Sequence, residues 1–146
     1  MSQPESLYVA SFHKRFRGRI AICVGYSEEM VEVFPIVIED ENMKALGIVA
    51  MAALSNEDIA SVHFLHFSVF KPRCGNGSKM IVMLCQKADQ LGVALSINPI
   101  PMPNGRDSQV SSQALIDWCG QYGFRGDTLL IRRPYKPFNL RLINCR

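Results

Sequence analysis

The stretch Phe67-Ser-Val-Phe-Lys-Pro-Arg-Cys-Gly-Asn-Gly-Ser-Lys-Met80 decides the fold of this chain. Its first residues end an alternating run of aromatic and polar side chains that predicts a β-strand over 61–70. From Ser78 to Leu91 apolar residues recur at three- and four-residue steps, which predicts a helix, and Gly92 stands where a helix cap is expected. The sequence therefore predicts a strand, a glycine turn and a helix in direct succession.

The glycine turn has the composition of an anion-binding site. Free backbone N–H groups and the helix dipole at a helix start favour a pyrophosphate there. Gly75 and Gly77 let the backbone approach phosphates closely, Ser78 can cap the helix or bind a phosphate oxygen, and Arg73 and Lys79 add positive charge. The turn lacks the Walker ending and the third glycine of the dinucleotide fingerprint. Taken alone, it indicates either a phosphate-binding turn or an ordinary strand-to-helix turn.

The rest of the chain predicts a mixed α/β domain. Short β-branched or apolar runs predict strands at 19–24, 31–39, 46–54, 93–97 and 128–132. A second helix is expected from Ser111-Ser112 through Cys119, ending at Gly123, whereas residues 7–16 are compatible with helix or strand. Strands dominate the first half and alternate with helices in the second, which predicts a sheet with helices packed against it.

Length and composition predict a single domain and exclude several classes of protein. The chain has 146 residues, 48% of them hydrophobic, and a net charge of +3 that does not favour a nucleic-acid partner. No apolar run approaches the ~20 residues of a membrane span, and no signal peptide is visible, so a cytoplasmic protein is expected. Neither a disulfide framework nor a metal site is expected from five widely spaced cysteines, Cys23, Cys74, Cys85, Cys119 and Cys145.

Several motifs, in the same order, resemble the GNAT N-acetyltransferases. Gly75-Asn76-Gly77 is similar to part of that family's [Arg/Gln]-x-x-Gly-x-[Gly/Ala] turn, although Pro72 stands where the family has Arg or Gln. Residues 88–98, 115–124 and 130–134 resemble later family segments, so the resemblance covers residues 61–134. It implies an acyl-CoA N-acyltransferase fold, α/β (α+β), with a mixed, largely antiparallel central sheet flanked by helices. We expect residues 1–134 to form this domain and residues 135–146 to be a basic tail.

The resemblance also implies acetyl-CoA as co-substrate and a set of residues that hold it. Backbone groups of Phe67 and Val69 would bind the pantetheine arm. The pyrophosphate would lie on the segment formed by Arg73, Cys74, Gly75, Asn76, Gly77, Ser78 and Lys79.

Candidate catalytic groups follow from the same resemblance. His63 lies where some family members carry a base, and the odd spacing from His66 predicts that these two histidines face opposite sides of the strand. Cys119 takes the place of the family's usual tyrosine acid, and Tyr122 is an alternative acid one helical turn later.

The function expected from these features is N-acetyl transfer. Acetyl-CoA would acetylate a primary amine by direct attack in a ternary complex, on an acceptor that is a small molecule or a protein. The alternative is a non-catalytic binding or inhibitor protein of the same fold, acting through protein or nucleic-acid contacts. A homodimer is compatible with the resemblance.

Overall fold

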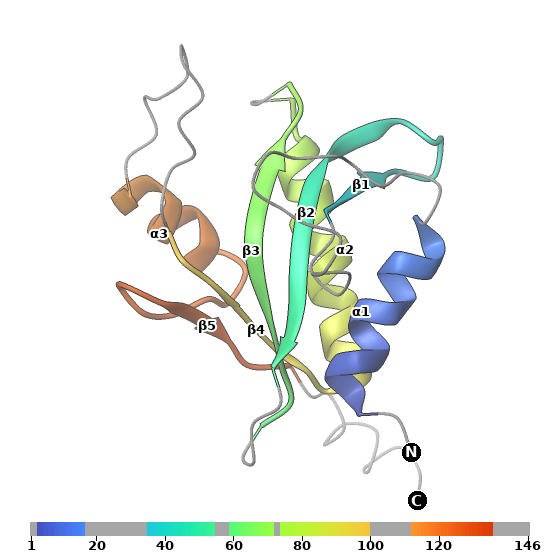
Figure 1. Ribbon diagram of the computed structural model, residues 1–146. Coiled ribbons are helices and arrows are strands. Elements are labelled where there is room, and N and C mark those ends of the chain that lie inside the picture. Colours follow the sequence, from blue (N-terminus) through green and yellow to red (C-terminus); the bar gives the residue numbers. More distant parts are fainter. Residues whose placement is uncertain (1–2, 17–34, 55–58, 72–73, 100–111, 136–146) are drawn as a thin grey trace, which may run out of the picture.

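The part of the chain that the structure describes forms one five-stranded sheet with helices against it (Figure 1). The computed structural model describes residues 3–16, 35–54, 59–71, 74–99 and 112–135. In chain order these residues form α1 (Pro4–Arg15), β1 (Ile36–Glu39), β2 (Ala45–Leu54), β3 (Ser61–Val69), α2 (Asn76–Leu91), β4 (Ala94–Ile97), α3 (Ser112–Gly120) and β5 (Leu130–Arg132). The strand order is β1-β2-β3-β4-β5, and only the β3–β4 pair is parallel. The predicted mixed, largely antiparallel sheet is confirmed.

Residues 7–15 of the segment that the sequence left open lie in helix α1, and Phe16 is its C-terminal cap. Pro4 stands at its first positions, where the missing N–H costs nothing, and Tyr8, Val9 and Phe12 recur at helical spacing on its buried side. The predicted strand at 19–24, the turn at 55–58, Pro72, Arg73 and residues 136–146 of the tail lie outside the described residues.

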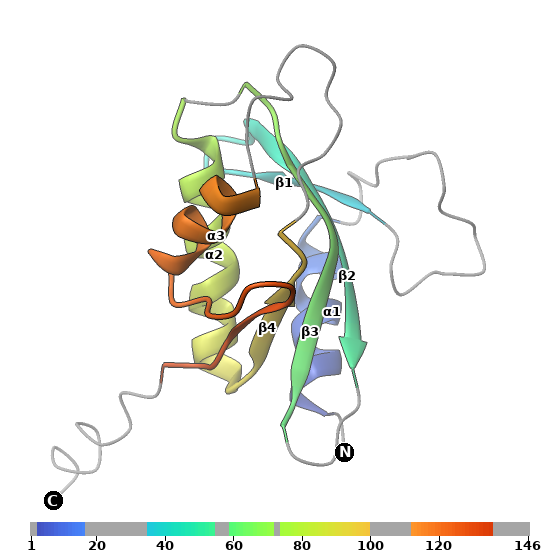
Figure 2. The same cartoon turned by 90° about the vertical axis from the view of Figure 1, so that its left-hand side faces the viewer.

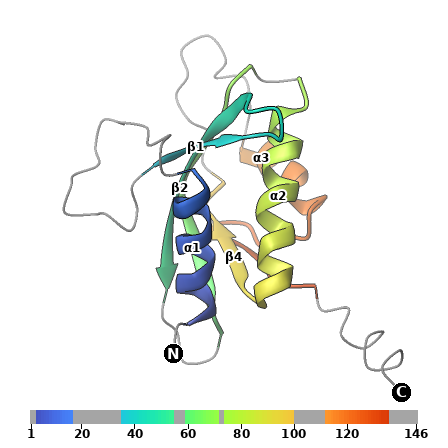
Figure 3. The same cartoon turned by 90° about the vertical axis from the view of Figure 1, so that its right-hand side faces the viewer.

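Helices α1 and α2 lie side by side on one face of the sheet (Figure 3). They are joined by a buried hydrogen bond in which the Tyr8 hydroxyl donates to the Leu84 carbonyl oxygen at 2.8 Å. Burial raises the pKa of Tyr8 well above its usual value, so the hydroxyl keeps the proton that it donates. This pair fixes the helix that carries the glycine turn.

Strand β2 approaches α2 so closely that one position admits only glycine. A Cβ built on Gly47 would lie 2.2 Å from the carbonyl oxygen of Ser68 and 2.6 Å from Sδ of Met80. Because the first of these neighbours is backbone, a larger residue would push β3 away from β2. Gly47 therefore sets the position of the end of β3 relative to α2.

Strand β4 pairs along its whole length with only the first part of β3. Their parallel register runs from Ser61 opposite Ala94 to Phe64 opposite Ile97 and stops there. The register with β2 shifts at the same place: Phe64 pairs with Met51 and His66 with Ala50, which leaves Leu65 as a bulge. Strand β4 ends at Ile97, so no described strand pairs with β3 beyond the bulge on this side, and α3 lies near this end of β4 (Figure 1).

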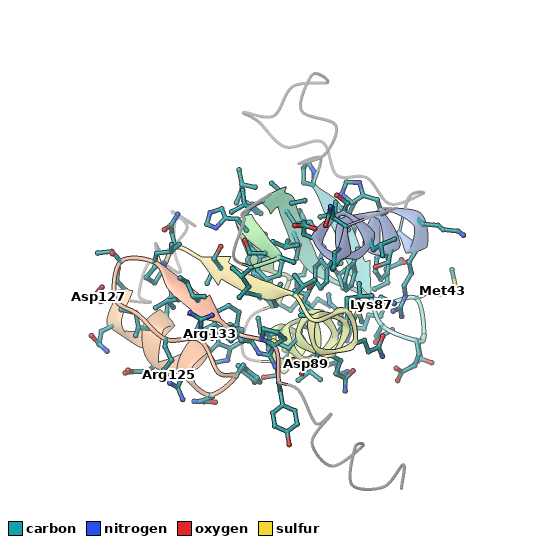
Figure 4. All side chains as sticks on the ribbon, turned by 90° about the horizontal axis from the view of Figure 1, so that it is seen from below. Met43, Lys87, Asp89, Arg125, Asp127 and Arg133 are labelled. Atoms are coloured by element: carbon teal, nitrogen blue, oxygen red, sulfur yellow. The ribbon has the colours of Figure 1, made fainter. Side chains whose placement is uncertain are left out.

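A buried ion pair ties the far end of α2 to β5. Arg132 is 8% exposed and binds Asp89 through two hydrogen bonds of 2.9 and 3.0 Å. Figure 4 shows Asp89 beside the segment that follows β5, and the N–H of Tyr135 donates to the same carboxylate at 2.7 Å. Nε of Arg132 also donates to the carbonyl oxygen of Tyr122 at 2.8 Å, so the pair fixes the turn after α3 as well.

Candidate functional site

The second half of β3 forms one wall of the candidate site, and no described strand pairs with it on the side of β4. The N–H of Phe70 donates to the Leu46 carbonyl oxygen of β2 at 2.8 Å. Because backbone groups alternate along a strand, those of Val69 and Phe67 point the other way, towards the side that β4 has left. The two residues expected to bind a pantetheine arm thus turn their backbone groups to the side on which no described strand pairs with them.

The start of α2 lies at the end of this edge. Gly75 caps the helix with φ of 82°, a left-handed conformation in which a side chain would be strained. No side chain caps this end, and the first turn contains no acidic residue. The first backbone bond of the helix runs from the N–H of Lys79 to Gly75 at 3.1 Å, so the three preceding N–H groups have no partner within the helix. This arrangement favours an anion.

The side chains of the glycine turn have different roles. Asn76 is 2% exposed and donates from Nδ2 to the Phe70 carbonyl oxygen at 2.7 Å, so its side chain joins the strand to the helix and leaves only its backbone for a ligand. Cys74 is an exposed free thiol, and the side chain of Lys79 is exposed. The backbone N–H of Lys44 and, more weakly, the charge of Lys79 lower the pKa of Asp40 in the neighbouring β1–β2 turn.

Helix α3 lies beside the N-terminal half of α2 (Figure 2). Aromatic side chains of α3 and of the turn after it lie at the first turn of α2. The rings of Trp118 and Phe67 lie 6.0 Å apart, and those of Trp118 and Tyr122 lie 5.3 Å apart. A Cβ on Gly77 would lie 3.5 Å from the Trp118 ring. The Tyr122 hydroxyl donates to Oγ of Ser78 at 3.0 Å. Tyr122 therefore reaches the first turn of α2, at the expected phosphate end of the site.

Cys119 lies in the hydrophobic core. Its side chain is 3% exposed, and burial raises the pKa of its thiol to about 11. A thiol with this pKa releases its proton less readily than an exposed thiol does. The geometry thus gives Cys119 a packing role, although sequence resemblance placed an acid at this position.

His63 and His66 lie on the same face of β3, and the expectation of opposite faces is wrong. Their register partners are Ala52 and Ala50, which are two residues apart on β2 and therefore share a face. The bulge at Leu65 adds one residue between the histidines and reverses the alternation. Both side chains consequently face away from α1 and α2.

Each of these histidines is paired with a serine hydroxyl. Nδ1 of His63 lies 2.8 Å from Oγ of Ser96 on β4, and Nε2 of His66 lies 2.9 Å from Oγ of Ser68. Both imidazoles are partly buried, and burial lowers the pKa of each below its usual value of 6.5. Ser96 was not predicted as a site residue, and its one signal in the sequence is a polar side chain within the apolar run 93–97.

The described residues contain no group of three or more histidine, cysteine, aspartate or glutamate side chains that could hold a metal ion. In the same part of the chain, no helix is both long and apolar enough to cross a membrane.

Known proteins resemble this chain in fold rather than in sequence. No family model and no curated protein matches it. Among solved structures, it is similar to an anti-CRISPR protein at 21% identity, over 66% of this chain and 96% of that chain, with a TM-score of 0.48. It is also similar to N-acetylglutamate synthase from Neisseria gonorrhoeae, complexed with coenzyme A and N-acetyl-glutamate, at 13% identity over 90% of this chain and 32% of that chain, with a TM-score of 0.47.

A GNAT family N-acetyltransferase from Escherichia coli, solved in complex with CoA, is similar at 13% identity, over 89% of this chain and 67% of that chain, with a TM-score of 0.45. The synthase and the N-acetyltransferase were both solved with coenzyme A bound. At these identities the likeness concerns the fold, and this chain spans only about a third of the synthase (32%). The activity proposed below rests on the geometry of this chain's own site.

Proposed function

We propose that this protein binds acetyl-CoA and transfers its acetyl group to a primary amine. The observation that carries the proposal is the continuity between two sets of backbone groups that have no hydrogen-bond partner among the described residues. The edge of β3 beyond the bulge at Leu65 leads directly to the uncapped start of α2, where no carboxylate lies in the first turn. An extended ligand with amides at one end and phosphates at the other fits this sequence of groups.

The dimensions agree with a pantetheine arm on β3. From Leu65 to Val69 a strand rises by roughly 13 Å, at about 3.3 Å per residue. Over this length the outward backbone groups of Phe67 and Val69 hydrogen-bond the amides of the arm as a neighbouring strand would. The pyrophosphate then lies at the N–H groups of Gly77 and Ser78. Tyr122, already bonded to Ser78, is a further phosphate ligand.

The acetyl group then lies near the bulge, where His63 is available as a base. The amine nitrogen attacks the thioester carbonyl carbon, and the carbonyl oxygen accepts a hydrogen bond from a backbone N–H of β3. The C–N bond forms, the C–S bond breaks, and the amine proton passes to Nε2 of His63. CoA leaves as a thiolate, and since alkyl thiols ionise near pH 8.5, this departure requires no strong acid. Cys119 is not needed in this scheme.

Turnover with a panel of amines tests the proposal. Acetyl-CoA is incubated with the full chain and with primary amines of each class, including small polyamines, amino acids and peptides. The acetylated product is detected by mass spectrometry, because the exposed thiol of Cys74 would react with a thiol reagent. We expect acetylated product from at least one class. Binding of CoA without any product would support the non-catalytic alternative instead.

A further inference from the structure

Ser96 is held in the middle of three paired strands. It is opposite His63 of β3 on one side and opposite Ile131 of β5 on the other. Its side chain is 6% exposed, so its hydroxyl is largely withdrawn from water. The register on both sides therefore fixes where the hydroxyl lies.

We propose that Ser96 is a positioning residue for the proposed acetyl transfer: its hydroxyl oxygen accepts a hydrogen bond from Nδ1–H of His63 and keeps Nε2 free to receive the amine proton. The geometry behind this assignment is the 2.8 Å separation of Nδ1 and Oγ. The assignment rests on the proposed function, because it concerns the base of that reaction.

The hydrogen bond matters because a neutral imidazole carries its proton on only one nitrogen. The partner of one ring nitrogen decides which nitrogen keeps the proton. With Nδ1–H donated to Ser96, Nε2 has a lone pair and is a base. When Nε2 gains a proton, the bond from Nδ1–H to Oγ persists, so nothing has to rearrange during the proton transfer.

Among the described residues around His63, Ser96 is the neighbour that determines which ring nitrogen carries the proton. Its register partner on β2 is Ala52, and Ser96 on β4 is in turn opposite the apolar Ile131. The other titratable side chain on this face of β3 is His66, which is engaged with Ser68. Burial alone accounts for the lowered pKa of His63, with no contribution from a charged group of the described residues. A fixed hydroxyl thus occupies the position that a carboxylate has in many histidine bases.

The first experiment reads the tautomer of His63 in the free protein. Histidine ¹⁵N NMR of the full chain, assigned with the His63→Gln variant, is recorded above pH 7 for the wild type and for Ser96→Ala. We expect the Nδ1–H tautomer in the wild type and a shift towards Nε2–H in Ser96→Ala. A wild-type spectrum dominated by Nε2–H, or one that Ser96→Ala does not change, overturns the assignment.

The second experiment separates positioning from packing by kinetics. Ser96→Ala is expected to lower kcat about tenfold, with an unchanged KM for acetyl-CoA, since one neutral hydrogen bond to the base is lost. Ser96→Thr, which keeps the hydroxyl, should restore most of the rate. Ser68→Ala removes the matching bond to His66 and should leave kcat unchanged. Equal loss in Ser96→Ala and Ser96→Thr would overturn the positioning role.

These outcomes can be told apart from failure of the proposed function. If the wild type produces no acetylated amine, the proposed function fails, while the tautomer in the free protein still tests the pairing of Ser96 with His63. If the wild type is active and His63 holds its proton on Nε2, the role of Ser96 fails and acetyl transfer stands.

Discussion

Ser78 is the third residue of α2 after the cap Gly75, so its side chain lies where phosphates are expected. We predict that Ser78→Asp weakens acetyl-CoA binding at least tenfold, because it adds a carboxylate next to the pyrophosphate. An acidic residue in the first turn also interacts favourably with the helix dipole, by roughly 0.3–1 kcal/mol. Binding should therefore fall while thermal stability is kept or raised. Calorimetry and thermal unfolding measure the two effects.

Ser78→Asn is the matched control for this charge. It is close to Asp in size and shape, is neutral, and removes the same hydroxyl that Tyr122 binds. We expect its affinity for acetyl-CoA to stay within about threefold of the wild type. Equal affinities for the Asp and Asn variants would mean that no anion binds at the start of α2.

At individual positions, the sequence indicated which residues lie at the candidate site, but not which side chains they contact. Gly75 could be placed in the turn before α2, and Ser78 in the first turn of that helix, because a strand, a glycine turn and a helix are local signals. The packing role of Cys119 and the pairing of Ser96 with His63 could not, since both depend on which elements meet in space. Asn76 was placed at the correct turn, but its side chain is directed to the carbonyl of Phe70.

At the scale of elements, the ion pair between Asp89 and Arg132 holds α2, β5 and the turn that carries Tyr122. Asp89→Asn leaves a guanidinium that is 10% exposed without its counter-charge. We predict a loss of roughly 2–3 kcal/mol in the free energy of unfolding. This is below the cost for a fully buried pair, because the Asp89 side chain is 25% exposed. Urea unfolding measures the loss.

Asp117→Asn provides the comparison for that variant. Asp117 accepts an exposed hydrogen bond from Gln113 within α3, so its change should alter stability by less than about 0.5 kcal/mol. A double variant, Asp89→Asn with Arg132→Met, should recover part of the loss, because it no longer buries an unpaired charge. No difference between Asp89→Asn and Asp117→Asn would show that the buried pair does not stabilise the fold.

For the strands that the structure describes, the sequence predicted the ends to within a few residues. It did not predict the bulge in β3. Alternation along 61–70 identifies a strand, but the extra residue at Leu65 is defined only by the register with β2. That one residue placed His63 and His66 on a common face, and it follows directly after Phe64, the last residue of β3 that pairs with β4. The geometry of the site thus depended on long-range pairing that no local pattern contains.

At the scale of the whole molecule, the described histidines make stability depend on pH in one direction. Burial lowers the pKa of His13, His63 and His66 below the usual value of 6.5. As pH falls through 6.5, the unfolded chain binds protons before the folded one does, so folding stability decreases. We expect the free energy of unfolding to be highest above this pH and to decline towards pH 5, as measured by urea unfolding.

His13→Gln serves as the internal control for this dependence. Nε2 of His13 is buried without a hydrogen-bond partner among the described residues, and His13 lies on α1, away from the candidate site. Its replacement should reduce the slope of stability against pH between 5 and 6.5. A wild-type free energy of unfolding that stays flat or increases as the pH falls from 6.5 to 5 would contradict the burial of these side chains.

The central claim is that the edge of β3 and the start of α2 together bind acetyl-CoA. Titration calorimetry of the full chain with acetyl-CoA tests this claim most directly. We predict binding of one molecule per chain with Kd of roughly micromolar order, weakened by Ser78→Asp and little changed by Ser78→Asn. Absence of binding at about a hundred times that concentration, with a chain shown to be folded, would contradict the claim.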